Sequence, residues 1–174
     1  MASSALPTPM SILVWNCRGL GNPQSIRIFR KLTKEKCPFL VFLVETKARK
    51  QQLEDVRRRL KLDGCFAVDN MDLSGGIAPF WKEDWNVRII NYTRWYISAL
   101  IKEEENGHIW QFTGFYGHPE TAKRSSSWQL LEMLKPHSHG MDVCRRFQQN
   151  SAPEGKTRGS QQTIQTNRSF QTSS

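Results

Sequence analysis

The sequence predicts an α/β fold, and three observations support this prediction. Short apolar runs typical of strands alternate with helical patterns in the first part of the chain. Several runs rich in β-branched and aromatic residues then follow, and Asn106-Gly107 between two of them is a strong hairpin signal. The 174 residues have the length of one domain. Strands that alternate with helices, followed by consecutive strands that form an antiparallel meander, indicate an α/β sandwich rather than a purely parallel, doubly wound sheet.

The strand predictions rest on the length and continuity of the apolar runs. Phe39–Val44 is apolar throughout, which is typical of a strand buried on both faces. Ser11–Trp15 is a similar but shorter run. Five further strands are predicted at 65–68, 77–81, 85–92, 95–101 and 109–116.

Three amphipathic helices are predicted between these strands and after them. The first begins near Gln24, and Pro23 suits its first turn. The second covers Arg49–Leu62 and is ended by Gly64. The third covers Pro119–Leu134. The order is therefore strand, helix, strand, helix, strand, then a β-meander and a final helix.

The composition divides the chain into three parts. Residues 1–9 and 137–174 are poor in large apolar side chains, so we expect a disordered lead-in and a disordered tail. Residues 10–136 hold nearly all of the Leu, Ile, Val and Trp, and we expect them to form the folded part. No internal repeat is visible.

The chain is basic, with 25 Lys and Arg against 16 Asp and Glu and a formal net charge of +9. Basic proteins are attracted to polyanions such as nucleic acid, although a solvated basic surface has the same composition. The four cysteines show no C-x-x-C pair and no His at ligand spacing. Zinc is therefore not expected, and a reducing, intracellular compartment is. No stretch approaches the ~20 apolar residues of a membrane span, and no signal peptide is recognisable.

Polar side chains end three of the predicted strands. Asn16 follows the first apolar run, Glu45 follows the second, and Tyr116 ends the last. If the first two runs are neighbouring strands, Asn16 and Glu45 emerge side by side at one rim of a sheet. Mg²⁺ is bound through one or two carboxylates, with waters and substrate phosphate completing the shell. Glu45 is therefore a candidate metal ligand, and the Tyr116 phenol is a candidate donor to a phosphate oxygen.

Each candidate also has a purely structural interpretation. Asn is common where strands turn into loops, a strand-end Glu can pair with Lys47, and a buried Tyr often has a satisfied hydroxyl. The loop Arg18–Gly21 has two glycines and could approach a phosphate, but two glycines do not make a phosphate-binding fingerprint. His118 could act as a general base, but a lone His in a turn is more often structural. The agreement among the three strand ends favours a functional site.

Four motifs occur in an order and at intervals that closely resemble the endonuclease/exonuclease/phosphatase superfamily. They are Val14–Leu20 (VWNCRGL), Val44–Lys47 (VETK), Ser74–Trp81 (SGGIAPFW) and Phe112–Gly117 (FTGFYG). The variety that they resemble is the apurinic-like endonuclease domain of plant LINE-type (non-LTR) retrotransposons. The resemblance covers about residues 10–137.

This resemblance implies the N-terminal portion of a four-layer α/β sandwich of the DNase I-like type. It also implies Mg²⁺-dependent hydrolysis of phosphodiesters, which in the retrotransposon members nicks target DNA to prime reverse transcription. By motif, Glu45 resembles the metal-binding carboxylate, Asn16 the active-site amide and Tyr116 the tyrosine near the scissile phosphate. Arg18 and Lys47 are expected to contact substrate at the same rim. DNA is the expected partner, and the nucleus is the expected location.

Two segments that the superfamily uses are missing after Pro136. Members supply a G-D-F-N segment after the third helix and, later, a Ser/Asp-His segment; neither is found here. Codons for 140–151 read one nucleotide later permit W-M-C-V-G-D-F-N-K-I-L, which contains the missing motif. We therefore expect that a one-base frameshift near His137–Gly140 produced the tail.

The sequence therefore predicts a LINE-derived endonuclease domain that is inactive because half of the site is absent. Without the second half, buried sheet faces and strand edges would be left open, which predicts low stability. Two alternatives remain: a non-catalytic, basic nucleic-acid-binding remnant and a functionless pseudogene product. The sequence leaves the oligomeric state open.

Overall fold

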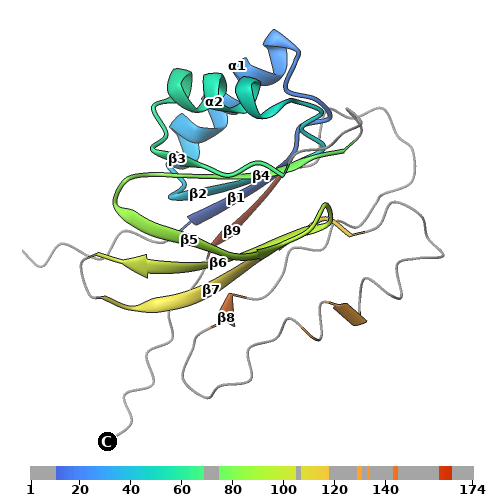
Figure 1. The fold of residues 1–174 in the computed structure, drawn as a ribbon. Helices are drawn as coiled ribbons and strands as arrows, with labels where there is room; N and C mark the ends of the chain where they lie inside the picture. Colours follow the sequence, from blue (N-terminus) through green and yellow to red (C-terminus); the bar gives the residue numbers. More distant parts are fainter. Residues whose placement is uncertain are drawn as a thin grey trace, which may run out of the picture.

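In a computed structural model of the chain, the described parts are residues 11–68, 75–104 and 107–117, the helical residues Gln129, Leu130 and Met133, and the backbone of Val143–Cys144 and Gln161–Gln165. These parts contain two sheets that lie one above the other, with two helices above the upper sheet (Figure 1). The mixed α/β architecture predicted from the sequence is therefore confirmed.

The upper sheet combines parallel and antiparallel strands in the order β3-β4-β2-β1-β9. Its strands are β1 (Ser11–Asn16), β2 (Leu40–Val44), β3 (Gly64–Cys65), β4 (Ile77–Trp81) and β9 (Gln161–Gln165). β1 and β2 are parallel, with Asn16 opposite Val44, so their carboxyl ends meet at one rim. The parallel pairing follows from the helix between the two strands, since a crossover of this length returns the chain in the same direction.

The lower sheet is a meander of antiparallel strands, extended by one short parallel strand, in the order β5-β6-β7-β8. Its strands are β5 (Trp85–Tyr92), β6 (Tyr96–Glu103), β7 (Ile109–Phe115) and β8 (Val143–Cys144). The predicted hairpin at Asn106-Gly107 joins β6 to β7, and Lys102 lies opposite Ile109 beside it. Asn106 itself lies outside the described residues.

The core has two parts, one on each face of the upper sheet. Between the sheets, Val14, Phe42 and Ile77 pack against Ile97 and Phe112. On the opposite face, alternate residues of the same strands pack against the helices, through buried side chains that include Phe29, Leu32, Leu53 and Val56. β2 therefore contributes buried side chains to both faces, as its unbroken apolar run predicted.

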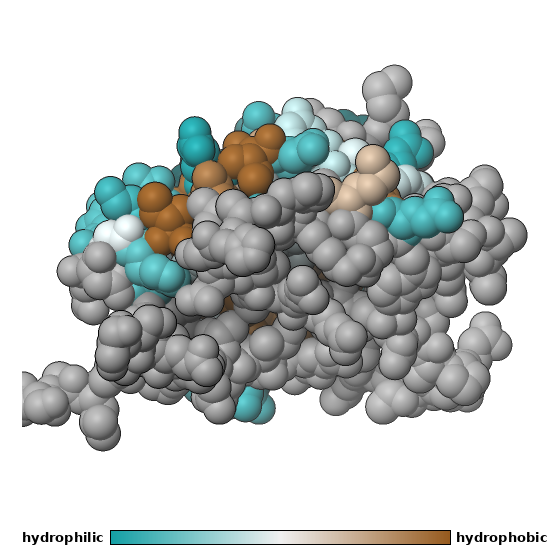
Figure 2. All heavy atoms as spheres, turned by 90° about the horizontal axis from the view of Figure 1, so that it is seen from below, coloured by the Kyte–Doolittle hydropathy of each residue, from teal (hydrophilic) through white to brown (hydrophobic). Residues whose placement is uncertain are grey.

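The outer face of the lower sheet carries exposed apolar side chains. Viewed from this side, Figure 2 shows hydrophobic atoms in brown beside hydrophilic atoms in teal. Ile90 is 44% exposed and Ile109 is 41% exposed. Most of the helix predicted at Pro119–Leu134 lies outside the described residues.

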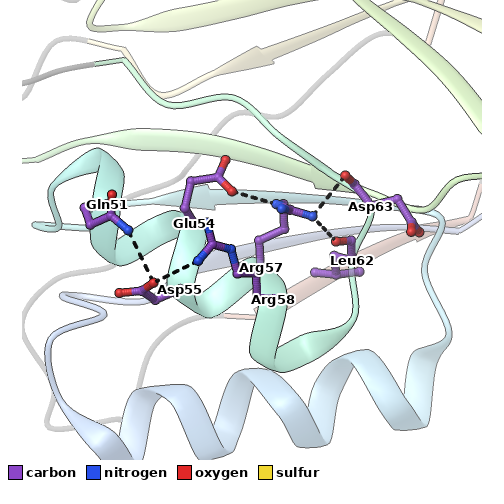
Figure 3. A network of polar contacts seen from close by, with 7 residues as sticks. All are labelled: Gln51, Glu54, Asp55, Arg57, Arg58, Leu62 and Asp63. Carbon is purple, nitrogen blue, oxygen red and sulfur yellow. Dashed lines mark hydrogen bonds and ion pairs between the residues drawn. The ribbon is translucent and has the colours of Figure 1, made fainter.

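The start of α1 (Pro23–Lys36) agrees with the sequence prediction, whereas α2 (Lys50–Leu60) ends two residues before the predicted Leu62, with Lys61 as its left-handed C-cap. α1 starts with proline, and the side-chain oxygen of Asn22 accepts a hydrogen bond from the Gln24 amide at 2.9 Å. In α2, the Arg57 side chain donates to Glu54 at 2.8 Å and to the Leu62 carbonyl at 2.9 Å (Figure 3). This contact connects the end of α2 to the segment that leads into β3.

Three strands differ from the sequence predictions. β3 is shorter than the predicted strand at 65–68, although the Phe66 amide still donates to the Pro79 carbonyl. β8 and β9 lie in the segment 137–174, which was expected to be disordered. β9 pairs antiparallel with β1 at the sheet edge, where the backbone of β1 offers hydrogen-bonding groups to any extended segment. The rest of that segment lies outside the described residues.

Candidate active site

Asn16, Glu45 and Tyr116 meet at one rim of the sandwich. Asn16 is the last residue of β1, Glu45 follows β2 and Tyr116 follows β7. The Asn16 amide Nδ2 donates a hydrogen bond to Glu45 Oε1 at 2.9 Å, and the Tyr116 hydroxyl donates to the same oxygen at 3.1 Å. The structure therefore brings together the three residues that the sequence singled out, from both sheets.

The carboxylate of Glu45 keeps one oxygen available. Both hydrogen bonds are made to Oε1, and Oε2 makes none with the other described residues. Asn16 is 5% exposed, and its Oδ1 accepts a hydrogen bond from the Arg18 amide at 3.1 Å, so its side-chain orientation is determined from both ends. An oriented carboxylate with an available oxygen is suited to bind a hard cation.

The backbone around Glu45 adopts an uncommon conformation. Arg18, Glu45 and Lys47 have φ angles of 48°, 55° and 45°, in the left-handed region that non-glycine residues seldom occupy. The two other such residues in the described part, Cys37 and Lys61, are helix C-caps, where this conformation is usual. Backbone strain that is not explained by a cap or a turn tends to cluster at functional sites.

Hydrogen bonds on both sides hold the Glu45–Lys47 segment in this conformation. On one side, the Gly19 amide donates to the Glu45 carbonyl and the Leu20 amide donates to the Thr46 carbonyl, both at 2.8 Å. On the other side, the Thr46 amide donates to the Gly76 carbonyl at 3.1 Å, and the Lys47 amide donates to the Gly75 carbonyl at 2.8 Å. The segment is therefore bonded to a neighbour on each side, as a central strand is, although the regular pairing of β2 has ended at Val44.

The two glycines after position 74 explain how the segment is held. Gly75 and Gly76 have φ angles of 81° and 92°, which residues with a side chain rarely adopt. The sequence indicated a tight turn at 74–76. Ser74 lies outside the described residues, and the two glycines have the additional role of presenting their carbonyls to Thr46 and Lys47.

Burial and Glu45 together alter the acidity of Tyr116. Its pKa is raised to about 12, first by burial and then by the negative charge of Glu45 and the hydrogen bond to it. The phenol therefore stays protonated at neutral pH and acts as a hydrogen-bond donor. Cys17, beside Asn16, is buried, and its pKa is also raised to about 12, mainly by burial. The Cys17 thiol donates to the Val44 carbonyl at 3.3 Å and has no sign of a reactive thiolate.

Two further predicted residues, Arg18 and Lys47, lie on the loops beside Glu45. Both are exposed, and a β-carbon placed on Gly19 would lie 3.9 Å from the Lys47 side chain. They add positive charge next to the carboxylate. His118 lies outside the described residues.

Glu45 is not part of a larger cluster of metal-ligating side chains among the described residues. Within residues 11–68, 75–104 and 107–117, no three His, Cys, Asp or Glu side chains are grouped so that they could hold a metal ion. Mg²⁺ needs only one or two protein carboxylates when waters and phosphate complete its shell. Glu45, oriented by Asn16 and Tyr116, fits that minimal requirement.

Sequence reasoning missed Arg94 and Trp95, which lie in the turn between β5 and β6. The Trp95 carbonyl accepts hydrogen bonds from the amides of Tyr116 and Gly117, and the Trp95 ring stacks beside the Tyr116 ring. Trp95 lies opposite Tyr116 because the pairing of β6 with β7 continues past Tyr96 and Phe115. The predicted hairpin could have indicated this neighbour, but an aromatic residue at a strand start is too common to mark a site.

Comparison with solved structures identifies the fold. The catalytic domain of human Nocturnin with a bound sulfate anion aligns with a TM-score of 0.54, over 72% of this chain and 57% of that one, at 14% identity. The fold is DNase I-like. The fold that the sequence motifs implied is thereby confirmed.

Two other structures with this fold align equally well. A D. rerio TDP2 humanized by 14 mutations gives a TM-score of 0.53, over 71% of this chain and 57% of that one, at 14% identity. The 3′ phosphatase NExo from Neisseria, bound to a product DNA hairpin, gives 0.51 over 71% and 50%, at 14% identity. This chain thus spans about half the length of the solved structures that it matches. No model of a known protein family and no curated protein sequence matches the chain.

Proposed function

We propose that this chain is the N-terminal half of a Mg²⁺-dependent endonuclease domain of the LINE type, and that it does not cleave DNA by itself. The single observation that carries the proposal is the convergence of Asn16 and Tyr116 on one oxygen of Glu45, at a rim built from both sheets. The superfamily fold of the chain supports a phosphodiesterase ancestry. The LINE origin rests on the four sequence motifs.

In the proposed site, the residues of this chain bind and orient the phosphodiester. Glu45 would hold Mg²⁺, which when bound draws negative charge from a phosphate oxygen. Asn16 and Tyr116 keep the carboxylate in one orientation, and Arg18 and Lys47 attract the backbone of the nucleic acid. DNA is the proposed substrate and the nucleus the proposed location. None of the helices in the described part of the chain combines the length and apolarity that a membrane span needs.

The proposed inactivity rests mainly on the sequence after Pro136. Among the described residues, Glu45 is not part of any group of three His, Cys, Asp or Glu side chains that could hold a metal ion. Superfamily members take the remaining acidic and basic groups of the site from the segments that this sequence lacks after Pro136. We propose that the one-base frameshift near His137–Gly140 removed them.

Glu45→Gln tests the proposed metal site separately from the proposed inactivity, because it preserves the shape of the side chain and removes its charge. We expect Mg²⁺ to raise the melting temperature of the natural chain and not that of Glu45→Gln, since a bound ligand stabilises the folded state. Glu83→Gln, an exposed carboxylate away from this rim, is the matched control and should behave like the natural chain. Equal Mg²⁺ responses in all three proteins would contradict the proposed metal site.

Plasmid nicking tests the proposed inactivity. We expect no Mg²⁺-dependent nicking from the natural chain. A chain expressed from the locus with the reading frame restored near His137–Gly140 should nick, and should lose nicking when Glu45 is replaced by Gln. Nicking by the natural chain that Glu45→Gln abolishes would refute the inactivity but leave the enzyme class intact. A locus whose shifted frame does not encode G-D-F-N would refute the frameshift.

A second candidate function is nucleic-acid binding without catalysis. The observation that favours it is the solvent face of α1, where five exposed basic residues accompany one acidic residue, Glu35. The basic residues are Arg27, Arg30, Lys31, Lys34 and Lys36. Lys31 pairs with Glu35, and the other four take part in no ion pair between described residues. On α2, Arg57 and Arg58 pair with Glu54 and Asp55, so that helix is partly neutralised (Figure 3). This candidate predicts DNA binding that Arg30→Glu weakens and that neither Mg²⁺ nor Glu45→Gln affects.

A further inference from the structure

The turn between β5 and β6 is bonded directly to the end of β7, next to the candidate site. The Trp95 carbonyl accepts a hydrogen bond from the Tyr116 amide at 2.7 Å and a longer one from the Gly117 amide at 3.3 Å. The Trp95 amide donates to the Thr93 hydroxyl at 3.1 Å, which stabilises the turn. The position of this turn is therefore coupled to the position of Tyr116.

The side chains continue this connection from Glu45 to Arg94. The Tyr116 hydroxyl contacts Glu45, and the Tyr116 ring stacks beside Trp95 with ring centroids 6.4 Å apart and planes 23° apart. The guanidinium carbon of Arg94 lies 5.8 Å from the centroid of the Trp95 ring. Asn16, Glu45, Tyr116, Trp95 and Arg94 are thus connected by successive contacts, a series of residues called the row below.

Arg94 has the properties of a phosphate-binding arginine. Its side chain is exposed, and it takes part in none of the three ion pairs between described residues. A guanidinium held against an aromatic ring loses less conformational freedom on binding, and its planar N–H groups can bind two phosphate oxygens together. A structural role alone would require only the contact with Trp95.

We propose that Arg94, positioned by Trp95, binds a second phosphate on the strand whose neighbouring phosphate lies at Glu45. The inference rests on the proposed function and narrows its substrate class. A site with two phosphate positions along one rim selects a polynucleotide strand over a mononucleotide or a small phosphate ester. Arg18, whose amide is bonded to Asn16, lies at the other end of the row and would add charge for the same strand.

Binding of a fluorescein-labelled DNA hairpin to the full chain, measured by anisotropy in EDTA, tests Arg94 without requiring catalysis. We expect Arg94→Ala to weaken binding about fivefold to tenfold at low salt and to reduce the slope of log K against log salt by about 1. The control is Arg88→Ala, an exposed arginine on the outer face of the lower sheet, which should change affinity by less than about twofold. An Arg94→Ala chain that binds like Arg88→Ala overturns the inference.

The role of Trp95 is tested by a double-mutant cycle. Since Trp95 acts through Arg94, Trp95→Ala should weaken binding about as much as Arg94→Ala, and the double variant should lose no more than either. Trp95→Phe keeps a flat aromatic face and should retain most of the affinity. Additive losses, or no recovery with Phe in a chain of unchanged melting temperature, would overturn the positioning role.

The same measurements separate this inference from the proposed function. A natural chain without salt-dependent DNA binding refutes both. A natural chain that binds DNA, with Arg94→Ala unaffected, refutes the second phosphate position alone. A mononucleotide that competes as well as the hairpin refutes the narrowed substrate class and leaves the proposed enzyme class standing.

Discussion

Replacing Gly114 by alanine should separate the two sheets at the place where they bring Tyr116 to Glu45. Gly114 lies in β7 and is buried, and a β-carbon built on it would overlap the ring of Phe42. Phe42 is fully buried and packs edge-on against Phe112 at 5.7 Å. The Phe42 ring therefore has little room to move, and the added methyl group must push β7 away from β2.

The expected cost follows from two opposing effects. Inserting a methyl group into a packed core destabilises a protein by about 1–3 kcal/mol. Replacing glycine by alanine stiffens the unfolded chain and returns about 0.4–1 kcal/mol. We therefore expect Gly114→Ala to lower the free energy of unfolding by about 1–2 kcal/mol. For a domain near 100 residues, each 1 kcal/mol corresponds to about 4–8 °C in melting temperature.

Urea denaturation followed by circular dichroism measures this difference. The control is Gly21→Ala, because a β-carbon at Gly21 meets no atom within 4 Å. Gly21→Ala should be neutral or slightly stabilising. In a Gly114→Ala background, Phe42→Leu should cost less than it does alone, because the smaller side chain makes room for the methyl group. Equal stabilities of the Gly114→Ala and Gly21→Ala chains would refute the close contact between β7 and Phe42.

Three other predictions concern the site and its surroundings. The pKa of Tyr116 is raised to about 12 in the folded chain, so the phenol deprotonates at a lower pH in the unfolded chain, and the free energy of unfolding should fall as pH rises from about 10 to 12. Urea titrations of Tyr116→Phe should show a smaller fall over this pH range, and an unchanged pH dependence would contradict the prediction. In a Cys144→Ser chain, the exposed Cys37 should react with a thiol reagent at pH 8 well before the buried Cys17, and equal rates would contradict the burial of Cys17. Lys47→Gly should raise the free energy of unfolding by about 0.5–1 kcal/mol by relieving its left-handed backbone, and a loss of stability would argue against strain there.

The sequence predicted the elements that local signals determine. The unbroken apolar run before Glu45 indicated a strand buried on both faces, and β2 has that role. Pro23 marked the start of α1 within a residue. β9 had no comparable signal, because its sequence QQTIQ contains a single large apolar residue and shows no apolar run. Its pairing depends on the available edge of β1, which is a property of the folded sheet.

For the site, the sequence predicted which residues meet but not how they are held. Asn16, Glu45 and Tyr116 end strands, and parallel pairing of β1 and β2 places the first two at one rim. The stacking of Trp95 on Tyr116 follows from the pairing of β6 with β7, because Tyr96 lies opposite Phe115 and the residues next to them are therefore also opposite each other. The contact between Tyr116 and Glu45, by contrast, depends on the packing of one sheet over the other, which no local pattern encodes. The left-handed conformation of Glu45 likewise depends on bonds to Gly19 and to Gly76 through Thr46, contributed by segments about 30 residues away on each side.

The strained segment around Glu45 bears on the proposed site. Left-handed backbone costs roughly 1–2 kcal/mol at each non-glycine residue, and Arg18, Glu45 and Lys47 all adopt it. Among the described residues, the hydrogen bonds that hold the Glu45–Lys47 backbone come from within residues 16–76, and none comes from a segment after Pro136. The geometry of the proposed metal ligand is thus independent of the proposed missing half, which would contribute additional acidic and basic groups. It follows that restoring the reading frame should change catalysis far more than it changes the affinity of Glu45 for Mg²⁺. If restoring the frame increased the nicking rate and the affinity for Mg²⁺ by the same factor, Glu45 would not be held in its binding orientation before the second half is added.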